Sequence, residues 1–432
     1  MAWDFSTDLE YTELLAWANQ FVREECEPLD LIITESHDLH DPVRNALIPP
    51  LQQIVKAKGL WATHLGPGLG GPGYGQVKLA LLNEILGRSV CAPIVFGSQA
   101  PDSGNSEILA HFGTPELKER YLRPLLDNQI VSSFSMTEPQ GGSDPKIFRT
   151  TAVQDGDEWV INGEKWFTSF ASLASFLIVM TVTDPEAGPY NQQTMFVVPA
   201  ETPGVNILRD VGMGYEPVGQ GIEGYVRYEN VRVPNDHMLG PRGGAFVVAQ
   251  TRLGGGRIHH AMRTVGLVRR IFDMMCERAV SRYTQGEILA NKQMVQEMVA
   301  DSWMEIEAFR LLTMQTAWKI DLLKDYQAVR ADISAVKAMM QKVLHDVSAR
   351  ALQIHGSLGT THEMPFVRYL TESFVLGLAD GPTEVHKVTL ARQLLKNYRP
   401  SEDHFPSTHL PRMRELAEQK FAAQLASIPR EL

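Results

Sequence analysis

A run of short β-rich segments, from about residue 131 to about residue 242, interrupts a chain that is otherwise patterned for helices. These segments, each bounded by turn-forming residues, are 176–183, 194–199, 205–208 and 224–233. Within 157–167, an Asn-Gly pair between apolar-rich runs predicts a hairpin turn. Because no helical pattern separates the segments, five or more strands at this spacing predict a small antiparallel barrel or sandwich.

Helical patterns fill the regions on both sides of this stretch. Residues 8–25 and 104–130 carry apolar side chains at helical spacing, with an internal break in the second segment. Beyond Gly244, an apolar stripe over 331–355 predicts a long helix that Gly356 ends. An amphipathic stretch at 411–425 predicts a terminal docking helix. The order along the chain is therefore helical, β and helical.

The composition is that of an ordinary globular protein. Of the 432 residues, 44% are apolar and 21% are charged, and no apolar run approaches the roughly 18–20 residues of a membrane span. The three cysteines, Cys26, Cys91 and Cys276, lie far apart without metal-ligand spacing, and no signal pattern opens the chain. The cysteines therefore predict a reducing, cytoplasmic environment and no metal site, and the apolar runs predict no membrane span. The net charge of −11 disfavours a nucleic-acid partner.

Five segments hold residue types that suit ligand binding: 134–144, 165–169, 251–257, 353–359 and 378–386. In the first, small hydroxyl residues and glycines let main-chain N–H groups approach a planar or phosphorylated ligand. A surface turn that caps its own backbone has the same composition. In the second, an aromatic side chain beside hydroxyl residues suits a flavin ring, although Trp166 and Phe167 also suit a core.

The third segment places Arg252 and three glycines at the start of a helix, which suits an anion or a closely packed helix. His259 and His260 follow without a plausible ligand set, and we expect them to be structural. In the last segment, Asp380 precedes Gly-Pro, so its carboxylate lies on a rigid turn. Taken alone, such a carboxylate caps a helix.

Together and in this order, the five segments resemble the acyl-CoA dehydrogenase family over roughly residues 5–398. A closer likeness is to a subgroup with Ala-Pro-Asp-x-Gly-Asn-x-Glu, here 100–107, and Ala-Asp-Gly-Pro-x-Glu-Val-His, here 379–386. In that subgroup an aspartate replaces the glutamate base of most relatives. The resemblance implies a mixed α and β chain with an N-terminal helical domain at 1–130 and a middle antiparallel β-barrel domain at 131–242. A C-terminal four-helix-bundle domain at 243–400 and a tail at 401–432 would follow.

The resemblance also implies roles for single residues. Asp380 would remove the α-proton of an acyl-CoA thioester, and the main-chain N–H of Glu384 would hold the carbonyl oxygen. The residues implied to bind FAD from the base's own chain are Met136, Thr137, Ser143, Phe167, Ser169, Thr383 and Glu384. Those implied to reach the FAD of a neighbouring subunit are Arg282, Gln353, Gly356 and Ser357, with Gln285 where relatives often carry an aromatic residue. The residues implied to contact substrate are Ser143, Arg252 and Gly381, with Arg252 near the CoA end.

Two departures bear on this assignment. Pro382 replaces a hydroxyl residue just after the base, which removes a potential flavin contact. Thr251 occupies the place where a minority of the family carries an alternative glutamate base, and threonine cannot serve as one. Asp380 therefore stays as the expected base. We expect an apolar channel to raise its pKa, because a carboxylate near pKa 4 is a weak base.

The implied product is a trans-2-enoyl-CoA, and the implied electron acceptor is an electron-transfer flavoprotein. The implied assembly is a homodimer or homotetramer. An alternative on the same fold is a nitroalkane-oxidase-like flavoprotein, which also uses an aspartate base but needs no CoA pocket. A DNA-associated relative is disfavoured by the pI near 5.7 and the lack of a basic run. The sequence does not select the length, branching or hydroxylation of the acyl chain.

Overall fold

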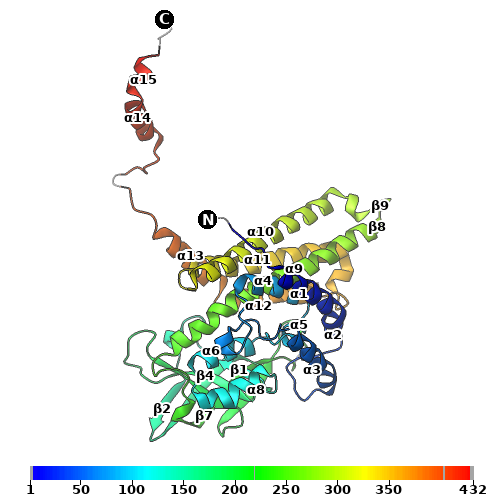
Figure 1. The fold of residues 1–432 in the computed structure, drawn as a ribbon, viewed down its shortest axis with the longest axis vertical. Coiled ribbons are helices and arrows are strands. Elements are labelled where there is room, and N and C mark those ends of the chain that lie inside the picture. Colours follow the sequence, from blue (N-terminus) through cyan, green and yellow to red (C-terminus); the bar gives the residue numbers. More distant parts are fainter. Residues whose placement is uncertain (1–2, 218, 402–403, 429–432) are drawn as a thin grey trace.

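The computed structural model describes residues 3–217, 219–401 and 404–428. Short helices at the N-terminal end are followed by a β-sheet and then by long helices, as the colours of Figure 1 show. The longest helix, α9 (Ala245–Ser281), leads from the sheet into the C-terminal bundle and packs against helices of both helical regions. Its N-terminal half is therefore the place where all three regions meet.

The N-terminal region buries a core of its own around Tyr11, Ile48 and Phe96. It begins with α1, capped by the Asp8 carboxylate, which accepts a hydrogen bond from the Tyr11 N–H. Its helices are α1 (Leu9–Phe21), α2 (Glu27–Leu29), α3 (Pro42–Ala57), α4 (Gln76–Leu86), α5 (Ala92–Val95), α6 (Asp102–Phe112), α7 (Pro115–Leu117) and α8 (Arg123–Leu126). The expected break within 104–130 falls between α6 and α7.

The middle region is a curved seven-stranded sheet, a half-barrel with strand order β1-β4-β2-β3-β7-β6 and β5 paired to β4. Its strands are β1 (Ser132–Ser135), β2 (Thr151–Asp155), β3 (Glu158–Ser169), β4 (Phe176–Val182), β5 (Gln193–Pro199), β6 (Val205–Val211) and β7 (Glu223–Pro234). Most neighbours are antiparallel, as expected, but β1 and β2 each pair parallel with β4. The predicted antiparallel β-barrel is thus a half-barrel that also contains two parallel pairings.

The prediction of a hairpin turn at Asn162-Gly163 was wrong. Strand β3 continues through both residues, and the tight turn lies at Gly156-Asp157, between β2 and β3. Gly163 has a φ of 146°, and a Cβ built there would lie 2.5 Å from Oγ1 of Thr150. The glycine therefore marks an irregularity in the β3–β7 pairing, where the residue just before β2 comes close, rather than a turn.

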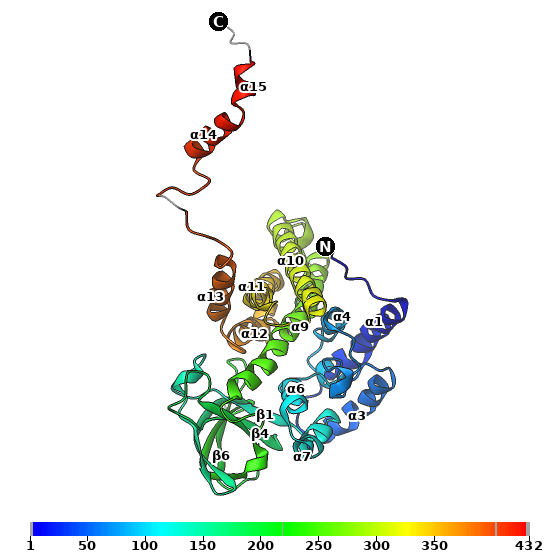
Figure 2. The same cartoon turned by 60° about the vertical axis from the view of Figure 1, so that its left-hand side comes forward.

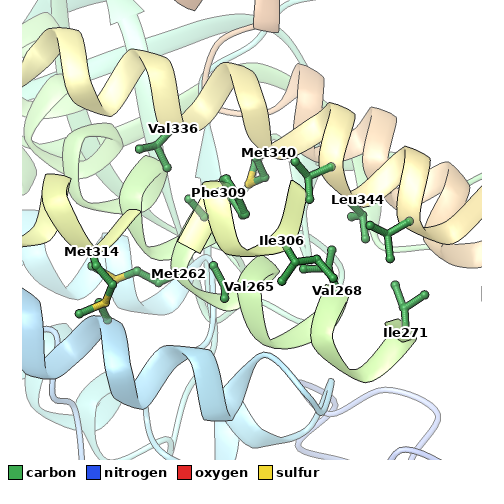
Figure 3. Close-up of a cluster of buried hydrophobic side chains, with 14 of the residues drawn as sticks. Met262, Val265, Val268, Ile271, Ile306, Phe309, Met314, Val336, Met340 and Leu344 are labelled. Atoms are coloured by element: carbon green, nitrogen blue, oxygen red, sulfur yellow. The ribbon is translucent and has the colours of Figure 1, made fainter. Parts of the chain in front are cut away.

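The C-terminal region is a bundle of long helices around one apolar core. The helices are α9, α10 (Gln293–Leu323), α11 (Arg330–His355), α12 (Phe366–Leu378) and α13 (Thr383–Leu395). Figure 3 shows Val265 and Ile271 of α9 packed with Phe309 of α10 and Met340 of α11. The predicted helix over 331–355 is confirmed as α11, and Gly356 ends it with a φ of 65°.

The tail forms two helices, α14 (Leu410–Lys420) and α15 (Ala422–Ala426), that project from the rest of the chain (Figures 1 and 2). None of the side chains described in these two helices is buried. The predicted helix is therefore present, but it does not dock on its own chain. In the described parts of the chain, no helix combines the length and apolar character that a membrane crossing requires.

Candidate active site

Asp380 lies on the turn that joins α12 to α13. Its φ of 54° and the φ of 101° at Gly381 reverse the chain within two residues. The main-chain oxygen of Asp380 accepts a 2.8 Å hydrogen bond from Nε of Arg257 and lies 3.3 Å from Nε2 of His386. These contacts fix the turn against α9, so the carboxylate points toward that helix.

One face of α9 surrounds the carboxylate. Nη1 of Arg252 lies 3.9 Å from Oδ1 of Asp380, and Nε2 of His260 lies 3.6 Å from Oδ2. Between these two residues, a Cβ built on Gly256 would be 3.1 Å from Oδ2, closer than ordinary contact. Gly256 thus gives the carboxylate the room to approach the helix, which explains one glycine of the expected Gly-Gly-Gly segment.

The segment 100–107 holds Arg252 in place. Oδ1 of Asn105 accepts a 2.9 Å hydrogen bond from Nε of Arg252, and the guanidinium carbon lies 4.1 Å from the centre of the Phe134 ring. Asn105 in turn donates to the Ser132 hydroxyl, which donates a 2.6 Å hydrogen bond to Asp102. The Asn and Asp of this motif therefore position the arginine that faces the base.

The charges around Asp380 are mostly positive. Burial raises the pKa of Asp380, but the positive charges of Arg252, Arg257 and Lys337, and that of His260 when it is protonated, outweigh burial, so the pKa of Asp380 lies below its ordinary value. Burial lowers the pKa of His260 to about 4, so His260 is uncharged at neutral pH. The standing positive charge beside the base thus comes from the arginines and the lysine. The expectation of a raised pKa for Asp380 was wrong for the chain alone, because the channel wall is cationic rather than apolar.

Two of the expected flavin-binding segments lie side by side at the end of β1. The Trp166 N–H donates a 2.8 Å hydrogen bond to the Thr137 carbonyl, and Nζ of Lys165 donates a 2.8 Å bond to the Met136 carbonyl. Lys165 also forms a fully buried 2.9 Å ion pair with Glu138. The sheet therefore brings together Met136 and Thr137 with the segment that carries Phe167 and Ser169.

These segments fit a flavin cofactor. Phe167 is 53% exposed although it is a large aromatic residue, and it has a φ of 52°. Ser143 is exposed with a φ of 64°, and a Cβ built on the adjacent Gly142 would have no atom within 4 Å. Such open backbone with positive φ suits the approach of a phosphate. The Ser169 hydroxyl donates a 2.9 Å hydrogen bond to Oε2 of Glu223.

The residues expected to reach a second subunit lie at the far end of the bundle. Arg282 ends α9, and the 30 residues between it and Arg252 correspond to about 45 Å of helix. Gln285 lies in the turn between β8 (Tyr283–Thr284) and β9 (Glu287–Ile288). Gln353, Gly356 and Ser357 lie exposed at the end of α11. A single chain therefore does not bring this group to the Asp380 site.

Thr383 and Glu384 occupy the first turn of α13, next to the base. The Thr383 hydroxyl donates a 2.7 Å hydrogen bond to Oε1 of Gln341, so this side chain ties the turn to α11. The side chain of Glu384 is exposed. Its N–H is one of the first four of the helix, which have no partner within a helix and can bind an oxygen atom.

Several residues around Asp380 were not predicted as site residues. They include Arg257, His260 and Lys337, and His260 was expected to be structural. A helical-face argument finds the α9 residues, because Arg252, Gly256 and His260 follow one another at intervals of four. No sequence spacing links Lys337, on α11, to the turn.

The fold and this site define an FAD-dependent oxidoreductase, as three family models of known proteins also indicate. The matching models are Acyl-CoA dehydrogenase, N-terminal domain, over residues 8–129, the middle domain over 133–231 and the C-terminal domain over 243–395. The chain belongs to the acyl-CoA dehydrogenase family.

Similar proteins cover most of the chain. Probable acyl-CoA dehydrogenase FadE2 of Mycobacterium tuberculosis is 40% identical over 351 residues, 80% of this chain and 85% of that protein. (R)-Benzylsuccinyl-CoA dehydrogenase of Thauera aromatica is 32% identical over 403 residues, 92% of this chain and 98% of that protein. Acyl-CoA dehydrogenase family member 11 of Gallus gallus is 36% identical over 390 residues, 88% of this chain. The chain spans only 50% of the length of that last protein.

Solved structures share the fold over nearly the whole length of the chain. A putative acyl-CoA dehydrogenase from Mycobacterium abscessus has a TM-score of 0.84 at 35% identity and covers 91% of this chain and 100% of its own. PigA with bound FAD has a TM-score of 0.75 at 21% identity, covering 92% of this chain and 100% of its own, which is a likeness of fold alone. These similarities leave the base and the substrate to be argued from the site.

Proposed function

We propose that this protein converts an acyl-CoA thioester to a trans-2-enoyl-CoA, with Asp380 as the base that removes the α-proton. The supporting observation is the carboxylate of Asp380, which points into a cleft between α9 and the N-terminal helices and is not used as a helix cap. Arg252 and His260 flank it at 3.9 and 3.6 Å. A carboxylate that is held in this way is ionised and ready to accept a proton.

The surroundings of Asp380 fix the position of its carboxylate, but they lower its pKa and so do not make it a stronger base. Arg257 holds its main-chain oxygen, and Gly256 sets how close its side chain lies to α9. Binding of the acyl group would exclude water and increase the effect of burial on the Asp380 pKa. The free N–H groups at the start of α13, including that of Glu384, would hold the thioester oxygen as negative charge develops there.

Bound FAD would accept the β-hydrogen as a hydride. In this proposal Met136, Thr137, Ser143, Phe167, Ser169 and Thr383 hold the FAD on the base's side. Arg282, Gln285, Gln353, Gly356 and Ser357 reach it from a neighbouring subunit, so the active unit is a homodimer or homotetramer. The approximate 45 Å between Arg252 and Arg282 along α9 supports a role for the second group in another subunit.

The remaining proposals concern contacts with substrate, the electron acceptor and the compartment. Ser143, Arg252 and Gly381 would contact the acyl-CoA, and an electron-transfer flavoprotein would reoxidise the reduced cofactor.

Cys26, Cys91 and Cys276 all carry free thiols, which supports a cytoplasmic location.

The test is rapid reduction of the bound flavin by acyl-CoA in Asp380→Asn and Asp380→Ala holoenzymes. Both variants are expected to retain FAD, measured by absorbance after desalting, and to lose about 10²–10⁴-fold in reduction rate. Asp236→Asn changes an exposed aspartate far from the cleft and should behave as wild type. Fast reduction in either Asp380 variant rules Asp380 out as the base. Oxygen consumption on nitroalkanes, without reduction by any acyl-CoA, would instead support a nitroalkane oxidase.

A further inference from the structure

The cleft beside Asp380 is lined mainly by polar side chains. It lies between α9 and α6 together with the segment that leads into α6. In the proposed function, the acyl group of the substrate would extend into this cleft beyond the base. The polar side chains that line it include His64, Glu107, His259, His260 and Arg263. Of the described residues in its lining, only alanine, proline and glycine are apolar. A cleft built for an unsubstituted alkyl chain is expected to carry leucine, valine or aromatic side chains instead.

Two imidazole nitrogens in this lining have no partner among the described residues. Nε2 of His259 is buried without a hydrogen bond, and the whole residue is only 9% exposed. Nδ1 of His64 is likewise buried without a hydrogen bond, although the residue as a whole is only half-buried. An unpaired buried polar atom costs about 1–3 kcal/mol. Such atoms beside a ligand cleft indicate that a ligand atom completes their hydrogen bonding.

The charges of the lining favour oxygen atoms in the ligand. Arg263 is half-buried, and its Nη1 donates a 3.1 Å hydrogen bond to the Ser98 carbonyl. Burial lowers the pKa of Arg263 only to about 10, so it remains charged, and burial raises the pKa of Glu107 to about 8, so it is protonated at neutral pH. Among the described residues that line the cleft, Asp380 is therefore the one ionised carboxylate opposite Arg252 and Arg263.

We propose that the acyl group of the substrate carries an oxygen substituent, a hydroxyl or a carboxylate, beyond the two carbons that react. This inference rests on the proposed acyl-CoA dehydrogenase activity and names its substrate class. The substituent accepts hydrogen bonds from Arg263 and pairs with the free nitrogens of His64 and His259. An alkyl chain in the same place leaves these groups dehydrated and unpaired, which opposes its binding.

The position of the substituent follows from the reaction. The carbons next to the thioester carry the transferred proton and hydride, so the oxygen must lie on the fourth carbon or further along. Three five-carbon thioesters therefore form a matched series: pentanoyl-CoA, 4-hydroxypentanoyl-CoA and glutaryl-CoA. The last two separate a hydroxyl substituent from a carboxylate, and decanoyl-CoA tests a long alkyl chain.

The experiment is anaerobic reduction of the wild-type holoenzyme by each of these four thioesters. At least one oxygen-bearing thioester is expected to exceed both alkyl thioesters by tenfold or more in kcat/KM. The dissociation constants of the four thioesters for Asp380→Asn holoenzyme, measured by calorimetry, should show the same order without turnover. If pentanoyl-CoA or decanoyl-CoA equals or exceeds both oxygen-bearing thioesters, this inference is overturned while the proposed function stands. If no acyl-CoA reduces the flavin, both are overturned.

A variant of the lining tests the same inference. His259→Leu removes an unpaired polar atom and is expected to fold, and its preference for the oxygen-bearing thioester should fall by about tenfold. Ser348→Ala is the control, because Ser348 also carries a buried hydroxyl without a partner but lies on α11 outside the cleft lining. An unchanged preference in a folded His259→Leu enzyme contradicts the role of His259. If this variant does not fold, the comparison of thioesters on wild-type enzyme still decides the matter.

Discussion

Nη1 of Arg252 lies 3.9 Å from Oδ1 of Asp380, and both side chains are largely buried, at 13% and 15% exposure. This distance is too long for a direct hydrogen bond but short enough for a strong effect of charge. Asn105 and the Phe134 ring hold the guanidinium from other sides. Arg252 therefore acts as a fixed positive charge that keeps the proposed base ionised.

Removal of this charge should move the pH dependence of the reaction. Asp380 must be deprotonated to act, so kcat/KM falls as the pH drops through its pKa. In Arg252→Met the pKa of Asp380 rises, because one of the charges that lower it is gone. The acidic limb of the kcat/KM profile is therefore expected at higher pH. Arg414→Met, on the projecting helix α14, should leave the profile unchanged. An unmoved acidic limb in Arg252→Met would show that Arg252 does not act through this carboxylate.

Two glycines of the same helix separate activity from stability. In Gly256→Ala, the new Cβ lies 3.1 Å from Oδ2 of Asp380 and displaces the carboxylate, so flavin reduction should slow by about tenfold or more. In Gly254→Ala, the nearest atom is Cδ1 of Tyr326 at 3.7 Å, an ordinary contact. Both changes favour the helix by up to about 1 kcal/mol. Thermal unfolding and stopped-flow reduction should show two stable enzymes, of which only Gly256→Ala is slow. Equal rates would refute the steric argument.

The fold was predictable from the sequence because its signals are long. The apolar stripe over 331–355 extends for seven turns, and Gly356 ends it where α11 ends. The error at Asn162-Gly163 arose because the same pair suits a turn and a bulge. Only the approach of Thr150, which immediately precedes β2, distinguishes the two. Local sequence carries no information about that neighbour.

The site residues that lie on one short segment were predictable from the sequence. Those that the fold brings together from distant segments were not. Asp380, Gly381 and Thr383 lie on one turn, and their proximity follows directly from the chain. Lys337 and His64 reach the same place from α11 and from the loop after α3, and no pattern connects them to Asp380. The pKa of Asp380 was expected in the wrong direction for this reason, since the charges that lower it come from other elements.

The buried ion pair between Glu138 and Lys165 should stabilise the loop proposed to bind flavin. Glu138 also accepts hydrogen bonds from the N–H groups of Arg149 and Thr150, at 2.6 and 3.0 Å. Removing one partner leaves the other charge buried, so Glu138→Ala is expected to lose about 3–5 kcal/mol of unfolding free energy. Asp155→Asn breaks an exposed pair with Arg232 and should cost little. Denaturant unfolding followed by tryptophan fluorescence measures both. A loss in Glu138→Ala no larger than in the surface variant would contradict this role.

Glu107 should make the stability of the protein depend on pH. Burial raises its pKa from 4.5 to about 8, so between these values the folded protein holds a proton that the unfolded chain releases. Stability contributed by this group therefore falls as pH rises through that window, by at most about 5 kcal/mol at about 1.4 kcal/mol per pKa unit. The glutamine side chain in Glu107→Gln cannot ionise, so this variant does not show that pH-dependent loss of stability.

The denaturation midpoint of Glu107→Gln, relative to that of wild type, is therefore expected to increase as the pH rises from 5 to 8. Both holoenzymes are compared at one protein concentration and with saturating FAD, because cofactor binding also shifts the midpoint. Glu116→Gln, on the exposed surface of α7, controls for the loss of one carboxylate. Midpoints of Glu107→Gln and wild type that stay parallel across this range would mean that Glu107 is ionised in the folded protein. The cleft would then hold a second negative charge, and its preference for an oxygen-bearing acyl group would weaken accordingly.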